Sequence, residues 1–89
     1  MPTRHATIGS SIGLHARPAS LVAQAVAATG LPVTIALDAG EPVDAHSSFA
    51  IMALNAKRGD IVTLTSNDDN ATQALDALVT LLERDLDAE

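Results

Sequence analysis

The residue types best suited to chemistry lie close together near the start of the chain. His15, Arg17 and Pro18 stand in the run Gly-Leu-His-Ala-Arg-Pro-Ala at residues 13–19. A neutral imidazole is a nucleophile, and a guanidinium forms charge-assisted hydrogen bonds with phosphate. A histidine in a loop is most often an ordinary surface residue, so the prediction depends on the three residues together. They predict a site that accepts a phosphoryl group on His15.

A helix is expected to begin at this motif and to position the imidazole. Residues 16–29 place apolar side chains at helical spacing. With His15 as the N-cap, Pro18 occupies the third helical position, where a missing backbone N–H costs no intrahelical bond. The positive end of the helix dipole and the backbone N–H groups of Ala16 and Arg17 disfavour a protonated ring and favour an added phosphate. The sequence therefore predicts a neutral, nucleophilic imidazole.

The remaining elements complete the order β-α-β-β-α-β-α. Strands are expected at residues 4–8, 31–37, 41–45 and 61–65. A long helix is expected at 16–29 and a short helix at 47–54. A last helix is expected behind a cap at Asp69 or Asn70, with an apolar stripe formed by Leu75, Leu78, Val79, Leu82 and Leu86. Gly30 and Ser47 are the expected caps at the end of the first helix and the start of the second. This order predicts a two-layer α+β fold with an antiparallel or mixed sheet and all helices on one face.

Composition narrows the function classes. The 89 residues suffice for one domain, and 47% are apolar, enough for a packed core. Five basic and eleven acidic residues give a net charge of −6, which repels nucleic acids, and a single aromatic residue, Phe49, provides no stacking platform. The chain has no cysteine and no apolar run long enough to cross a membrane. We expect a cytoplasmic protein without nucleic-acid partners or membrane insertion.

Two further histidines and an acidic tail have simpler interpretations. His5 and His46 have no i, i+4 partner and no supporting carboxylate pattern, so no metal site is expected. The acidic residues after Asn67 are interpreted as a solvated helix face and a frayed end.

Residues 13–19 resemble the active-site signature of the HPr phosphocarrier family of the bacterial phosphoenolpyruvate-dependent sugar phosphotransferase system. The resemblance covers the whole chain, including the order of the elements, the short helix at 47–54 and the turn formed by Lys57, Arg58 and Gly59. It implies one phosphocarrier domain over residues 1–89. It also implies an open-faced β-sandwich, with a four-stranded antiparallel sheet of order 1-4-2-3 and three helices on one face.

The resemblance also implies roles for the motif. His15 would accept a phosphoryl group on Nδ1 from phospho-enzyme I and pass it to enzyme IIA domains for sugar uptake. Arg17 would stabilise the phosphoryl group, with the backbone N–H groups of Ala16 and Arg17. The protein would be a monomeric carrier rather than an enzyme, with no cofactor and no metal.

A regulatory serine and a partner-binding patch follow from the same resemblance. Ser47 matches a serine that a kinase and a phosphorylase modify in some family members, although it is equally well explained as an N-cap, and Ser48 competes for that position. The implied contact patch consists of Ala16, Ser20, Ser48, Phe49 and Met52. Without the resemblance, Phe49 would be assigned to the core; with it, we expect an exposed ring.

Three positions depart from the family pattern. Ile12 stands where a small polar residue is usual, and Gln24 and Ala27 stand where many relatives have basic residues that face enzyme I. Weaker electrostatic steering of that encounter is therefore expected.

Two alternative functions remain open from the sequence. One is a regulatory HPr-like binding module, of the nitrogen-control type or controlled through Ser47, which acts through protein contacts. The other is a small phosphatase in which Arg17 binds phosphate, although residues 8–11 do not resemble a Gly-rich anion loop.

Overall fold

The computed structural model describes residues 1–11, 13–38 and 40–85. The strands are β1 (Thr3–Thr7), β2 (Thr34–Leu37), β3 (Val43–Asp44) and β4 (Ile61–Thr65). The helices are α1 (Ala16–Thr29), α2 (Ser48–Ala53) and α3 (Thr72–Glu83), and a 3₁₀ turn, η1 (Asp69–Ala71), precedes α3. The predicted order of elements is confirmed.

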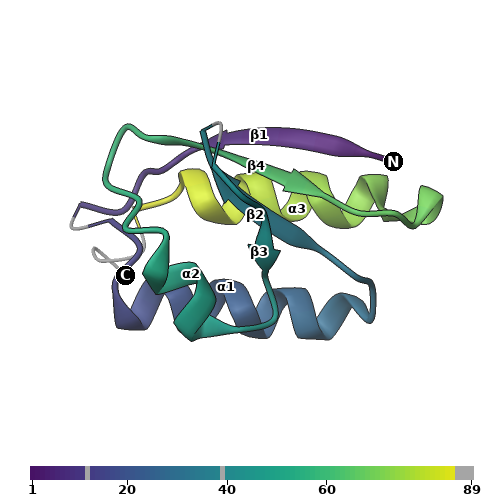
Figure 1. Ribbon diagram of the computed structural model, residues 1–89, viewed down its shortest axis with the longest axis horizontal. Coiled ribbons are helices and arrows are strands. Elements are labelled where there is room, and N and C mark those ends of the chain that lie inside the picture. The colour runs from purple at the N-terminus through teal and green to yellow at the C-terminus, as the bar shows by residue number, and fades with distance from the viewer. Residues whose placement is uncertain (12, 39, 86–89) are drawn as a thin grey trace.

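The four strands form one antiparallel sheet in the order β1-β4-β2-β3, as predicted. β4 lies in the middle and pairs with β1 from Thr3↔Thr65 to Thr7↔Ile61. On its other side β4 pairs with β2, and β3 adds only two residues at the edge. The helices lie together on one side of this sheet (Figure 1). The α+β fold, with three helices and one open sheet face, is confirmed.

Strand alternation directs the core toward the helices. In β4, Val62 and Leu64 are buried, whereas Ile61 on the opposite face is 52% exposed. The largest fully buried side chains come from both layers: Ile8, Val22, Val26, Val33, Ile35, Ile51, Val62, Leu64, Leu75, Leu78 and Leu82. Fully burying each such side chain is worth about 1.5–3 kcal/mol relative to exposure. This aliphatic core holds α1 and α3 against the sheet, so it fixes the position where α1 begins.

The caps of the first two helices agree with the sequence. Gly30 ends α1 in the left-handed conformation, with φ of 68°, and its N–H donates to the carbonyl of Ala27. Ser47 is the N-cap of α2, and its hydroxyl accepts a hydrogen bond from the backbone N–H of Ala50 at 3.2 Å. Ser48 is the first residue inside the helix, so the capping position belongs to Ser47.

Other boundaries differ from the prediction. β2 begins at Thr34, not at residue 31, because Leu31 donates its N–H to the hydroxyl of Thr29 and Pro32 has no N–H to donate to a strand. The predicted cap of the last helix at Asp69 or Asn70 was wrong: α3 begins after Ala71, which makes no side-chain capping bond. Asp68 instead caps the preceding 3₁₀ turn, where its carboxylate accepts the N–H of Asn70 at 2.8 Å. Leu86 lies outside the described residues. Within the described part of the chain, no helix is long and apolar enough to span a membrane.

Candidate phosphoryl-transfer site

His15 occupies the N-cap of α1, as predicted. Its backbone is extended, with φ of −83° and ψ of −167°, and its side chain makes no capping hydrogen bond. The first intrahelical bond runs from the N–H of Ala19 to the carbonyl of His15 at 2.9 Å. The N–H groups of Ala16 and Arg17 therefore precede the helical ladder, and Pro18, the third residue, has none.

The side chains of the motif divide between core and surface. Pro18 and Ala19 are buried, whereas Ala16 and Arg17 are exposed and His15 is partly exposed. Pro18 thus fixes the start of α1 from the core side, while the imidazole and the guanidinium remain accessible to a partner protein. The imidazole thus lies at the start of α1, adjacent in the chain to two backbone amides outside the helical ladder and to the exposed Arg17.

Gly13 allows the loop before His15 to lie directly on the segment before β4. Its φ is +87°, and a Cβ at this position would clash with the carbonyl oxygen of Ala56 and press on Cα of Lys57. The N–H of Leu14 donates to that same carbonyl at 2.9 Å, and the Leu14 side chain is buried. This contact was not predicted from the sequence, although a glycine two residues before the histidine was a signal for it.

The loop is also tied to the end of α3. Gly9 donates its N–H to the carbonyl of Leu82 at 3.0 Å, and it approaches the backbone of Glu83 so closely that a Cβ would not fit. Ser11 binds the carboxylate of Asp85 through both its N–H, at 3.1 Å, and its hydroxyl, at 2.6 Å. The interpretation of the acidic residues after Asn67 as a solvated face and a frayed end was therefore wrong for Asp85, which holds the loop before the motif.

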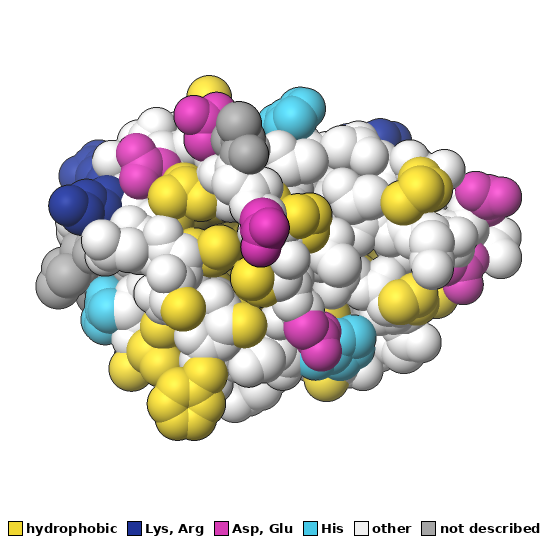
Figure 2. All heavy atoms as spheres, viewed as in Figure 1, with side chains coloured by type: hydrophobic (Ala, Val, Ile, Leu, Met, Phe, Trp, Pro, Cys, Tyr) yellow, Lys and Arg dark blue, Asp and Glu magenta, His cyan; other side chains and the backbone are white. Residues whose placement is uncertain are grey.

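The expected contact patch lies beside the site. Phe49 is 81% exposed, which confirms that it is not a core residue. Figure 2 shows hydrophobic side chains gathered where α2 lies next to the start of α1. The other members of the patch are the exposed Ala16 and the partly buried Ser20, Ser48 and Met52.

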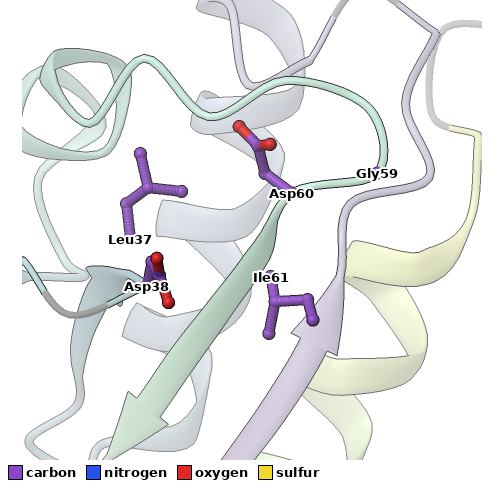
Figure 3. A pocket seen from close by; sticks show the side chains of 5 residues that line it. All are labelled: Leu37, Asp38, Gly59, Asp60 and Ile61. Atoms are coloured by element: carbon purple, nitrogen blue, oxygen red, sulfur yellow. The ribbon is translucent and has the colours of Figure 1, made fainter.

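A shallow hollow of about 330 Å³ adjoins His15. It is lined by Leu14, His15, Ala16, Met52, Asn55, Ala56 and Lys57. A second hollow, of about 350 Å³, lies near the end of β2 and the start of β4 and is lined by Leu37, Asp38, Gly59, Asp60 and Ile61 (Figure 3). The lining of the second hollow contains carboxylates and apolar groups but no cation or imidazole, so it does not extend the phosphoryl site.

The two other histidines are placed away from the motif. His5 Nδ1 lies 3.0 Å from the hydroxyl of Thr63 on the sheet. His46 Nδ1 lies 3.0 Å from a carboxylate oxygen of Asp44, a contact that the sequence did not predict. Hydrogen bonds from the backbone N–H and the ring of His46 hold the pKa of Asp44 below its ordinary value of 3.8. Among the described residues no group of three or more potential ligands could hold a metal ion.

Comparison with known proteins connects this geometry to a family. The family model described as the PTS HPr component phosphorylation site, where PTS is the phosphotransferase system, matches residues 2–84. The chain belongs to the HPr phosphocarrier family. HPr proteins are non-catalytic phosphoryl carriers of the phosphotransferase system, so the expectation of a carrier within this system, rather than an enzyme, is confirmed.

Individual relatives agree with the family assignment. The HPr of Streptomyces coelicolor is 42% identical over 87 residues, which cover 98% of this chain and 94% of that protein. The crystal structure of HPr from Bacillus anthracis superposes with a TM-score of 0.83 at 31% identity, covering 91% of this chain and 95% of that one. The phosphocarrier protein NPr of Proteus mirabilis is 27% identical over 86 residues, covering 97% of this chain and 96% of that protein.

Proposed function

We propose that this HPr accepts a phosphoryl group on Nδ1 of His15 and that Arg17 stabilises the group. The observation that supports the proposal best is the position of His15 as the accessible N-cap of α1, immediately before the amide groups of Ala16 and Arg17. A helix N-terminus and a guanidinium both favour a bound phosphate anion. They disfavour an imidazolium, so the same groups that bind the product keep the ring nucleophilic.

The transfer is a direct displacement at phosphorus. The neutral ring begins with its proton on Nε2, and the lone pair of Nδ1 forms the new N–P bond. As it forms, the N–P bond to the donor histidine breaks, and its electron pair returns to the donor imidazole. The reverse displacement at an acceptor histidine restores the lone pair on His15. In each step one proton also moves between the rings: the departing ring takes up a proton, the newly phosphorylated ring releases its own, and both rings end neutral.

The donor in this proposal is phospho-enzyme I, and the acceptors are enzyme IIA domains that serve sugar uptake in the cytoplasm. Both kinds of partner must reach the same histidine, which requires an open site rather than a deep pocket. The patch formed by Ala16, Ser20, Ser48, Phe49 and Met52 would be covered in each encounter. A monomer over residues 1–89 leaves this patch accessible.

Ser47 provides the basis for a second, regulatory role. Its hydroxyl caps α2 and is next to Ser48 and Phe49 in the contact patch. A phosphate at a helix N-terminus is compatible with the helix, but its charge would oppose an apolar partner surface. A kinase and a phosphorylase that act on Ser47 would thus switch partner binding. Replacing Ser47 with Asp should preserve the fold and slow transfer; transfer at the normal rate would argue against this switch.

The experiment for the main proposal uses phosphoenolpyruvate and enzyme I. The wild-type chain should gain one acid-labile phosphate, and the His15→Ala variant should gain none. His46→Ala is the matched control, because it removes another accessible imidazole that is away from the motif, and it should be labelled normally. Label that persists in the His15 variant would refute the assignment. Transfer from the phosphorylated protein to a sugar-type and a nitrogen-type IIA domain would then identify the branch that it serves.

A further inference from the structure

Several basic residues lie together on the surface, although the net charge of the chain is −6. Figure 2 shows Lys and Arg side chains together at one end of the visible face, close to a histidine. Lys57 lines the hollow beside His15, and Arg58 follows it in the same turn. The surface near the nucleophile thus has cations that the overall composition conceals.

The backbone of Lys57 is fixed against the loop that contains His15. Cα of Lys57 is one of the atoms that a Cβ on Gly13 would press on. The N–H of Lys57 donates to the carboxylate of Asp60 at 2.9 Å, and its carbonyl accepts the N–H of Asp60 at 2.9 Å. Two more bonds join this turn to the end of β1, from the N–H of Ile8 to Asp60 and from Gly59 to the carbonyl of Ile8. The start of the Lys57 side chain therefore has a defined place next to the motif.

The ammonium group of Lys57 is available to an anion. The side chain is exposed, and no ion pair joins it to any described residue. The nearby carboxylate of Asp60 is already bound to the backbone N–H of Lys57. A lysine has a flexible four-carbon stem and three donors, so its ammonium can reach across a shallow hollow toward a phosphate.

We propose that Lys57 is a second cationic contact for the phosphoryl group on His15, reaching it across the hollow lined by Met52 and Asn55. This inference rests on the proposed phosphorylation of His15. His15 forms part of the wall of this hollow, so a phosphoryl group on its ring adds negative charge there. Lys57 is the cation in the lining of the same hollow. Arg17, on α1, and Lys57, on the turn before β4, then bind the same group from two separate segments.

The test measures the bound phosphoryl group itself. In wild-type protein phosphorylated by enzyme I, the second ionisation of the phosphoryl group is followed by ³¹P nuclear magnetic resonance as pH is varied. A nearby cation favours the dianion, so Lys57→Gln should raise the midpoint of this ionisation by about 0.3–0.7 pH unit, the size typical of an exposed ion pair. Lys57→Arg retains the charge and should stay near the wild-type midpoint. Arg58→Gln is the matched control, since it removes a neighbouring cation that does not line the hollow.

Each outcome has a defined meaning. A shift in Lys57→Gln that is absent in Lys57→Arg and Arg58→Gln supports the contact. Equal shifts in the Lys57 and Arg58 variants would indicate a general field effect and overturn it. Slower transfer from enzyme I with an unchanged ³¹P midpoint would place Lys57 against the partner protein, and also overturn it. If the wild-type chain accepts no phosphate, the proposed function itself fails; if it does and only the shift is missing, the Lys57 inference alone fails.

Discussion

Replacement of Gly13 by alanine tests whether the loop contact positions His15. A non-glycine residue in the left-handed region lowers the free energy of unfolding by about 1–2 kcal/mol. Alanine also reduces the conformational entropy of the unfolded chain, which restores about 0.4–1 kcal/mol. At Gly13, with φ of +87°, the added Cβ also meets the carbonyl of Ala56. The hydrogen bond from Leu14 to that carbonyl is then lost, for another ~0.5–1.5 kcal/mol. The expected total loss is about 0.5–3 kcal/mol.

Gly30 and Gly59 provide matched controls for backbone strain. Their φ values are +68° and +90°, and a Cβ at either position meets nothing within 4 Å. Alanine at either position should lower the free energy of unfolding by about 0–1.5 kcal/mol, which is the backbone strain less the effect on the entropy of the unfolded chain. The Gly13 variant should therefore unfold at a lower temperature than either control, and since ~1 kcal/mol corresponds to about 4–8 °C in a domain of this size, the difference is measurable by calorimetry.

The phosphorylation rate is the second measurement on the same three variants. Because Gly13 lets the loop lie on the segment before β4, its replacement displaces the N-cap of α1 and should slow labelling of His15 by enzyme I. The variants at Gly30 and Gly59 should be labelled at rates close to wild type when fully folded. Equal stability and equal labelling rates in all three variants would refute the reasoning, because the contact with Ala56 would then have no effect on the site.

Two other predictions concern the contact patch and pH. Phe49→Ala should change the free energy of unfolding by less than about 0.5 kcal/mol but slow transfer roughly tenfold. Ile61→Ala removes the other exposed large hydrophobic side chain of the described strands and helices and should leave transfer unchanged. Equal slowing in the two variants would exclude a specific role for the ring. Because its bonds to His46 hold the pKa of Asp44 below the ordinary value, this carboxylate contributes stability above that value and loses the contribution as pH falls through the lower folded value. The wild-type chain should therefore exceed Asp44→Asn in urea midpoint at about pH 5 and lose that advantage toward about pH 2, and a difference that does not vary with pH would contradict the assignment.

Local signals were sufficient to predict the helix that bears the site. The bounds of α1 and the cap at Ser47 depend on residues within a few positions, namely the apolar spacing, Gly30 and a serine hydroxyl. The strand order came from the family resemblance, since the pattern alone gave only two layers with an antiparallel or mixed sheet. Sequence and structure agree where neighbouring residues decide the conformation.

Contacts between distant segments were not predictable in the same way. Gly13 meets Ala56, and Ser11 meets Asp85, across more than forty and more than seventy positions of the chain. No periodicity relates these residues, because each contact depends on how the finished core brings two loops together. Asp44 and His46 are only two positions apart, but their bond requires the turn between β3 and α2, and residue spacing alone does not specify that turn.

The bonds between the His15 loop and the end of α3 have a consequence for the order of events during synthesis. Gly9 and Ser11 depend on Leu82 and Asp85, which leave the ribosome long after the motif itself. Domains generally fold as units, so the loop reaches its final place only when α3 has packed. A nascent chain that already displays His15, Arg17 and Pro18 therefore lacks two of the contacts that hold the loop before His15. The loop that precedes His15 is thus expected to take its final place last.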